Sequence, residues 1–145
     1  MMQSLKSPQQ GQPSRQQVFT WIHSLLSDVP LSLKVEDLGK GTIYCRILHH
    51  YFPGIISINR IIWTPKSEYE NLLNLRIFHN AVVQLKLPLA FDPVKLSKEK
   101  LADNWAFLVA FYRQLAAQEE IIRPQEENKF NNPYFTPFSL PKRPI

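Results

Sequence analysis

The residues best placed to do chemistry are one cysteine and the histidines close to it. Cys45 and His49 are four residues apart and His50 follows, so on a helix Cys45 and His49 would share one face. Thiolate and imidazole are the ligands that zinc prefers, but a zinc site usually takes three or four protein ligands. Cys45 is the only cysteine of the chain. We therefore expect a packed cysteine beside surface histidines, and no metal site.

No other pattern indicates catalysis. Cys45 and His79 would make a nucleophile and a base, but no third group is available to orient them. Glu68 and Glu70 are two residues apart, so on a helix they point in different directions. The segment GKGT at 39–42 lacks the pattern of a phosphate-binding loop. The sequence therefore predicts that the chain is not an enzyme, with no catalytic residue and no cofactor.

The basic residues are better organised. Three lysines occur within six residues, in KLSKEK at 95–100, and Arg60 and Lys66 lie on either side of Trp63. The net charge is +5, and residues 15–115 contain 12 Lys and Arg against 8 Asp and Glu. Such clusters can attract an acidic partner, although a solvated charged stretch is the alternative. For Trp63 we expect a place in the core rather than an exposed position.

Helical patterns dominate the elements that must position these residues. Ser14 with Gln17, and Ser67 with Glu70, have the spacing of capping boxes. Apolar residues then recur three and four positions apart, as helices require. We predict helices near 15–27, 42–51, 67–87 and 102–117, short helical turns at 31–40 (closed by Gly39) and 93–96, and an extended loop at 55–64.

Length and composition fit one compact domain. The chain has 145 residues, of which 44% are hydrophobic, and this is enough to form a core. Of its 12 prolines, two precede Ser14 and five follow Leu115, as in tails on either side of a domain. No apolar run approaches the ~20 residues that span a bilayer, and the N-terminus lacks the apolar region of a secretory signal. We expect a reducing compartment because there is one cysteine.

The segments, taken in order, resemble the calponin-homology domain of the end-binding proteins, which track growing microtubule plus ends. The resemblance runs from about Ser14 to Leu115. The motifs that carry it are Ser14-Arg15, the G-x-x-Y-C of 41–45, Phe52-Pro53-Gly54, Glu68 with Glu70, Asn74 with Ile77, and the K-L-x-K-x-K-x-x-D-N of 95–104.

This resemblance implies an all-α, calponin-homology-type fold, and the proline distribution predicts flexible N- and C-terminal tails on either side of it. The implied organisation is a tail at 1–13, the calponin-homology domain at 14–117, and a proline- and asparagine-rich tail or linker at 118–145. Tyr44, Cys45, Trp105 and Phe107 are then structural, and Asp103-Asn104 organise the start of the last helix.

The resemblance also implies a function. Members of the family dock on tubulin between protofilaments and prefer growing ends, so the expected partner is tubulin in microtubules and the expected location is the cytoplasm and its cytoskeleton. A basic face would meet the acidic exterior of tubulin. The expected tubulin-binding residues are Arg15, Arg60, Lys66, Lys95, Lys98 and Lys100.

Two departures from the family pattern modify these expectations. The loop after Gly54 contains Asn59 and Ile62 where the family has more lysine, and Leu89 stands where a lysine is usual. We therefore expect a lower affinity for the microtubule lattice, or a different set of contacts with tubulin. Residues 116–145 contain no heptads, so the chain is either a fragment or a divergent monomer, and as given we expect a monomer.

Two other functions remain as alternatives. A calponin-homology scaffold with little tubulin affinity would bind a ciliary, kinetochore or adaptor protein through the Trp63 loop or the tail, and the tail could hold other cytoskeletal proteins. Nucleic-acid binding rests on a pI of 9.4 alone, with no recognised motif. We expect no nucleic-acid partner and no membrane partner.

Overall fold

The computed structural model describes the backbone of residues 11–130 and the side chains of residues 11–116. The helices in chain order are α2 (Arg15–Leu25), the 3-10 helix η1 (Val35–Lys40), α3 (Thr42–Tyr51), the 3-10 helix η2 (Ile58–Arg60), α4 (Glu68–Gln84), α5 (Pro93–Ser97) and α6 (Leu101–Phe130). Residues 11–130 form no strand. The prediction of an all-α fold is confirmed, and the 55–64 segment is a loop that contains η2.

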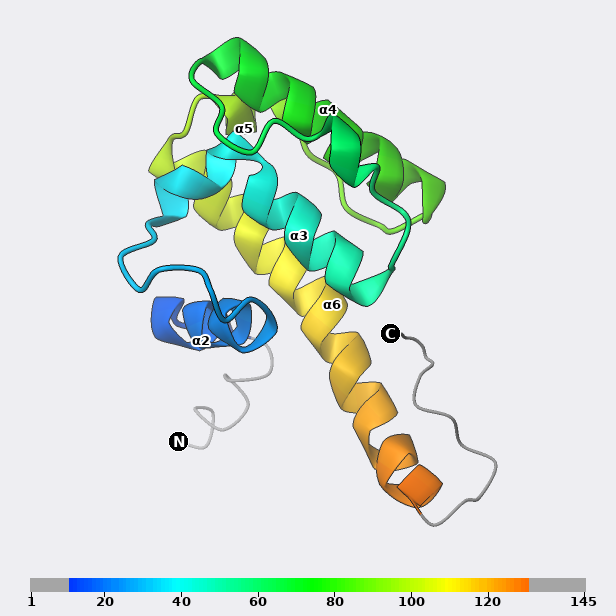
Figure 1. Ribbon diagram of the computed structural model, residues 1–145. Helices are drawn as coiled ribbons and strands as arrows, with labels where there is room; N and C mark the ends of the chain where they lie inside the picture. Colours follow the sequence, from blue (N-terminus) through cyan, green and yellow to red (C-terminus); the bar gives the residue numbers. More distant parts are fainter. Residues whose placement is uncertain (1–10, 131–145) are drawn as a thin grey trace.

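Helices α3 and α6 run side by side through the middle of the molecule (Figure 1). Helix α4 lies along the top of this pair and α2 lies beneath it, while α5 is close to η1 and the beginning of α6. The short helix η1 contacts α3, α4, α5 and α6, so it stands at the junction of the fold. The last part of α6 extends away from the other helices (Figure 1).

Aromatic side chains from three helices form the centre of the core. The ring of Tyr44 on α3 lies 5.5 Å from that of Phe78 on α4 and 5.1 Å from that of Phe107 on α6. Phe111, one turn further along α6, is fully buried against the same rings. Offset and edge-to-face pairs of this kind add stability beyond the area that they bury.

The N-terminal caps of α2 and α4 form where the sequence predicts them. The Ser14 hydroxyl accepts a hydrogen bond from the Gln17 N–H at 3.0 Å, and the Ser67 hydroxyl accepts one from the Glu70 N–H at 3.1 Å. The Gln17 side chain does not complete a capping box, because its amide donates instead to the Tyr112 hydroxyl at 3.0 Å. A contact between α2 and α6 has replaced the local one.

The end of the turn at 31–40 differs from the prediction. The helix η1 ends at Lys40, and Gly41, not Gly39, is the residue that closes it, with a φ of 84° in the left-handed region. Gly39 is needed for a different reason, since a Cβ there would come within 2.4 Å of the Leu96 carbonyl oxygen. Gly41 therefore turns the chain, and Gly39 allows η1 to pack against the end of α5.

The last helix is longer than predicted. Helix α6 continues to Phe130, whereas apolar periodicity placed its end at Ala117. Residues 118–123, QEEIIR, have good or moderate helix propensity, so no breaking signal stops the backbone at Ala117. Of the predicted tails at 1–13 and 118–145, residues 1–10 and 131–145 lie outside the described residues. Among the helices that are described, none has both the length and the apolar character needed to cross a bilayer.

Candidate functional site

The buried amide of Asn74 on α4 joins two other segments to this helix. Its Nδ2 donates to the carbonyl oxygens of Lys40 and Ile62 at 3.0 and 2.9 Å, and its Oδ1 accepts from the Ile62 N–H at 2.8 Å. Asn74 is fully buried, so these bonds are protected from water. They fix the end of η1 and the loop that follows η2, and thereby place Arg60 and Trp63 on the surface.

A second buried amide holds the lysine-rich segment KLSKEK at 95–100. Asn71 Nδ2 donates to the Ser97 carbonyl oxygen and to the Glu99 carboxylate, both at 2.9 Å. The Lys40 ammonium donates to the other Glu99 oxygen at 2.8 Å. Glu99 has a φ of 56°, a conformation that is costly for a residue with a Cβ, so its contacts must compensate for this strain. The backbone that presents Lys98 and Lys100 is therefore well determined.

The start of α6 is fixed in a similar way by Asn104. Its Nδ2 donates to the carbonyl oxygens of Leu96 and Lys100, and its Oδ1 accepts from the Tyr44 hydroxyl at 2.8 Å. Asn104 is fully buried, and burial raises the pKa of Tyr44 well above its ordinary value. The expectation that Asp103-Asn104 organise the start of the last helix is confirmed for Asn104.

The three lysines of the segment are all exposed. Lys95 lies on α5, Lys98 is the C-cap directly after α5, and Lys100 directly precedes α6. The Lys98 ammonium is 3.7 Å from the Glu68 carboxylate, and both side chains are largely exposed. Exposed pairs of this kind contribute at most about 1 kcal/mol, so Lys98 can exchange Glu68 for a carboxylate of a partner.

The other three predicted residues are also exposed, but the structure connects them to the lysines to different degrees. Lys66 lies two residues before Glu68, which is the partner of Lys98, and the Lys66 backbone N–H donates to the Glu70 carboxylate at 2.8 Å. Arg15 begins α2, and its guanidinium carbon lies 5.9 Å from the centre of the Trp105 ring on α6. Arg60 ends η2, and no described contact joins it to the lysines.

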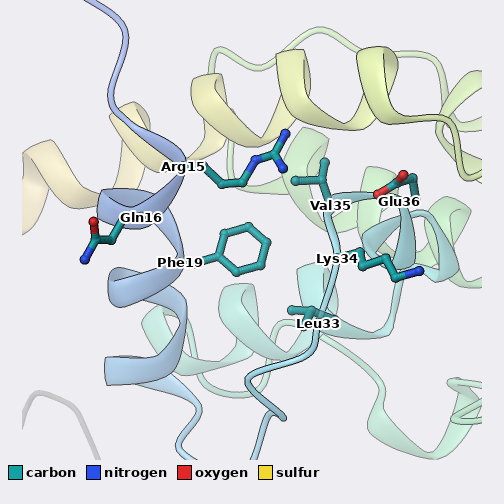
Figure 2. Close-up of a pocket in the computed structure, with 7 residues that line it drawn as sticks. All are labelled: Arg15, Gln16, Phe19, Leu33, Lys34, Val35 and Glu36. Atoms are coloured by element: carbon teal, nitrogen blue, oxygen red, sulfur yellow. The ribbon is translucent and has the colours of Figure 1, made fainter.

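Two features of this surface were not predicted from the sequence. Lys40 belongs to the same cluster through Glu99, although the sequence showed it only as part of a glycine-bracketed helix start. An open groove of about 480 Å³ lies next to Arg15, between α2 and the chain that enters η1 (Figure 2). No local sequence signal could have found it, because its two sides come from separate segments of the chain, 15–19 and 33–36.

Leu89, which stands where the family usually has a lysine, is half-buried and packs against the core. This position therefore gives the surface neither charge nor an exposed side chain.

Cys45 and its histidine neighbours behave as a packed cysteine and surface groups. Cys45 is 1% exposed, its thiol donates to the Asn74 carbonyl oxygen at 3.8 Å, and burial raises its pKa to about 12. His49 is half-buried and His50 is exposed. Within the described residues, no three His, Cys, Asp or Glu side chains are grouped so that they could hold a metal ion.

Trp63 does not have the core position that we expected. Its side chain is 46% exposed, and with Ile58 and Ile56 it lines a pocket of about 220 Å³ beside α3. The neighbouring Ile61 fills the core instead, with 6% of its surface exposed. The two hydrogen bonds between Asn74 and the Ile62 backbone fix this register, and so Ile61, not Trp63, points inward.

Comparison with known proteins identifies relatives of this chain. The family model of the calponin homology (CH) domain matches residues 12–117. Among curated proteins, the chain is similar to the microtubule-associated protein RP/EB family members 1C, 1B and 1A of Arabidopsis thaliana. The identities are 30%, 28% and 29% over 94 residues, which is 65% of this chain in each case.

A solved structure supports the same relationship. It comes from work on the structural basis of microtubule plus-end tracking by XMAP215, CLIP-170 and EB1. The TM-score is 0.58 and the identity is 28%, over 66% of this chain and 79% of the solved one. The aligned part spans only 28%, 31% and 33% of the three curated relatives. With the model matched over residues 12–117, this chain belongs to the calponin-homology domain family.

Proposed function

We propose that this chain is a non-enzymatic module that binds microtubules, prefers growing plus ends, and docks on tubulin through a basic face. The names of the relatives support the class of partner, since all three are microtubule-associated proteins of the RP/EB family. On this proposal the protein is located on cytoplasmic microtubules. The basic face consists of Arg15, Arg60, Lys66, Lys95, Lys98 and Lys100, with Lys40 beside it.

The observation that carries the proposal is the rigid presentation of the lysine segment. Buried Asn71 and Asn104 hold the backbone on both sides of Glu99, at Ser97 and Lys100, while the side chains of Lys95, Lys98 and Lys100 are exposed. Because the backbone that carries these charges is already ordered, docking costs it little conformational entropy. The charges also steer association with an acidic surface, and their contribution weakens as salt screens it.

Co-sedimentation with stabilised microtubules tests the face. The variant Lys95→Glu/Lys98→Glu/Lys100→Glu should lose at least about tenfold in affinity, because three attractive contacts become repulsive. Its matched control is Arg76→Glu/Lys86→Glu/Arg113→Glu, which makes the same change of net charge at exposed positions outside the proposed face. We expect the control to stay within about twofold of wild type. Far-UV circular dichroism checks that both variants fold.

Equal binding by wild type and the lysine variant would remove these lysines from the interface. End preference requires a separate measurement, which is imaging of the labelled chain on dynamic microtubules at low and moderate salt. Enrichment at growing ends supports the full proposal. Uniform decoration of the lattice would keep the tubulin contact and contradict the preference for growing ends.

The exposure of Trp63 favours one alternative, a calponin-homology scaffold that binds another protein through this loop. Microtubule co-sedimentation distinguishes this scaffold function from microtubule binding. If wild type does not bind microtubules at either salt concentration, the scaffold becomes the better interpretation. If Trp63→Ala binds microtubules as wild type does while the lysine variant does not, the tubulin contact is independent of the Trp63 loop.

A further inference from the structure

The groove beside Arg15 has an apolar floor and a polar rim. Phe19 projects from α2 toward Leu33 and Val35, and the Arg15 side chain extends into the same space (Figure 2). Val35 is buried, with 2% of its surface exposed, while Phe19 and Leu33 are half-buried. Gln16 points away from the groove (Figure 2). The groove is thus open, and its volume of about 480 Å³ is ample for one large apolar side chain.

The charges around the groove are unbalanced. Neither Arg15 nor Lys34 forms an ion pair with any described side chain, and Glu36 is the single acidic residue of the lining. Arg15 is held over the face of Trp105, so its position is set by the fold before any partner arrives. An apolar side chain with a carboxylate next to it would match both the floor and the unpaired guanidinium.

The helix η1 makes this groove continuous with the lysine segment. Val35 and Glu36, at its beginning, line the groove. Gly39 and Lys40, at its end, pack against Leu96 and Glu99. Six residues therefore join the groove to the segment that carries Lys98 and Lys100, and Arg15 at the rim belongs to the proposed basic face.

We propose that the groove is the apolar anchor site of the tubulin interface. It receives one apolar side chain from the tubulin surface, and a neighbouring carboxylate of tubulin pairs with Arg15. This inference rests on the proposed microtubule-binding function and adds to it a contact that is not electrostatic. The lysines would then steer association, and the groove would slow dissociation because apolar burial is lost only when the complex separates.

Two leucines of one loop provide a matched test. Leu33 lines the groove, whereas Leu31, two residues earlier, is 88% exposed and lies outside it. In microtubule co-sedimentation we expect Leu33→Asp to lose at least about tenfold in affinity and Leu31→Asp to stay within about twofold of wild type. The two variants add the same charge. Leu33→Ala and Leu31→Ala repeat the comparison without a charge, in case Leu33→Asp does not fold.

Salt separates this contact from the lysine contacts. Leu33→Ala should reduce microtubule affinity by the same factor at 50 and 200 mM salt. The lysine variant should reduce it by a smaller factor at the higher salt, because salt screens charges. Leu33 variants that bind like Leu31 variants, while the lysine variant fails, would overturn this inference and leave the proposed function intact. Failure of wild type to bind microtubules would overturn both. Self-association of wild type that Leu33→Asp abolishes would assign the groove to a second copy of the chain.

Discussion

At the scale of single residues, one buried amide decides where a whole loop lies. Asn74 uses both donors and its acceptor on backbone groups of residues 40 and 62, which are far from it in the sequence. The loop around η2 has no regular partner of its own, so this amide satisfies its backbone in place of a strand. The exposure of Arg60 and Trp63 follows from this one side chain.

We predict that Asn74→Ala destabilises the domain by about 3 kcal/mol. The substitution removes three hydrogen bonds and leaves partly buried backbone groups without partners, at about 1 kcal/mol for each such group. Asn80→Ala, at an exposed position of the same helix, should change stability by less than about 0.5 kcal/mol. Urea unfolding followed by circular dichroism measures both. A loss for Asn74→Ala as small as that for Asn80→Ala would show that water replaces the amide.

At the scale of elements, η1 and its two glycines bring the site together. The short helix contacts four others, and no apolar stripe in the sequence marks it as a junction. Gly41 directs the chain out of η1 and into α3 with a positive φ of 84°, at a point where the Asn74 side chain is close. The groove, the lysine segment and the core are therefore connected through a turn of six residues.

Substitution of two glycines separates the effect of backbone strain from that of crowding. Both Gly41 and Gly54 have a positive φ, of 84° and 91°. A Cβ at Gly41 would lie 2.8 Å from the Asn74 Cβ, whereas a Cβ at Gly54 would meet nothing within 4 Å. We expect Gly54→Ala to lose about 1 kcal/mol from strain alone, and Gly41→Ala to lose about 3 kcal/mol from strain and crowding. Thermal unfolding of the two variants tests this difference, and equal losses would contradict it.

At the scale of the whole molecule, the rigid core and the adaptable surface are separate. Buried aromatic rings from α3, α4 and α6 fix the relative positions of the helices. The lysines of the proposed basic face lie outside this core, on a segment that buried amides hold in place. Surface charges can therefore be exchanged in a test of binding without a large effect on folding, and the core offers an independent probe of folding.

Cys45 is that probe, because it lies in the core with 1% of its surface exposed. We predict that iodoacetamide modifies the native chain very slowly at pH 8, and that modification in urea follows the loss of helix. Burial raises the pKa of this thiol from 9.0 to about 12. The folded state thus keeps its proton where the unfolded state loses it, so this contribution to stability is complete below pH 9 and is lost as the pH rises from 9 to 12.

The control for this pH dependence is Cys45→Ala. Its free energy of unfolding should fall less between pH 8 and pH 10.5 than that of wild type, because the thiol no longer titrates. Mass spectrometry measures the modification, and urea unfolding at the two pH values measures stability. Rapid modification of the folded chain at pH 8 would show that the thiol is accessible and would contradict its buried position.

Local sequence signals determined the helical elements of this protein. Ser14 and Ser67 cap their helices because a hydroxyl reaches an N–H three residues away, and such contacts do not depend on the rest of the fold. Residues that are close in the sequence also revealed the lysine segment, and the order of the motifs indicated the family that the comparison confirms. The end of α6 was missed because the apolar stripe ended at residue 117 while helix propensity continued to Arg123.

Tertiary structure decided what depends on residues that are distant in the sequence. Trp63 is exposed because Asn74 fixes the register of its loop, and Gln17 leaves its capping box because Tyr112 offers a partner on another helix. Arg15 meets Trp105 only once α2 and α6 are packed together. The groove beside Arg15 has no signature in the sequence, because a cavity is formed by the space between elements. The sequence alone determined the helices, the charges and the family, while packing decided which of these residues share a surface.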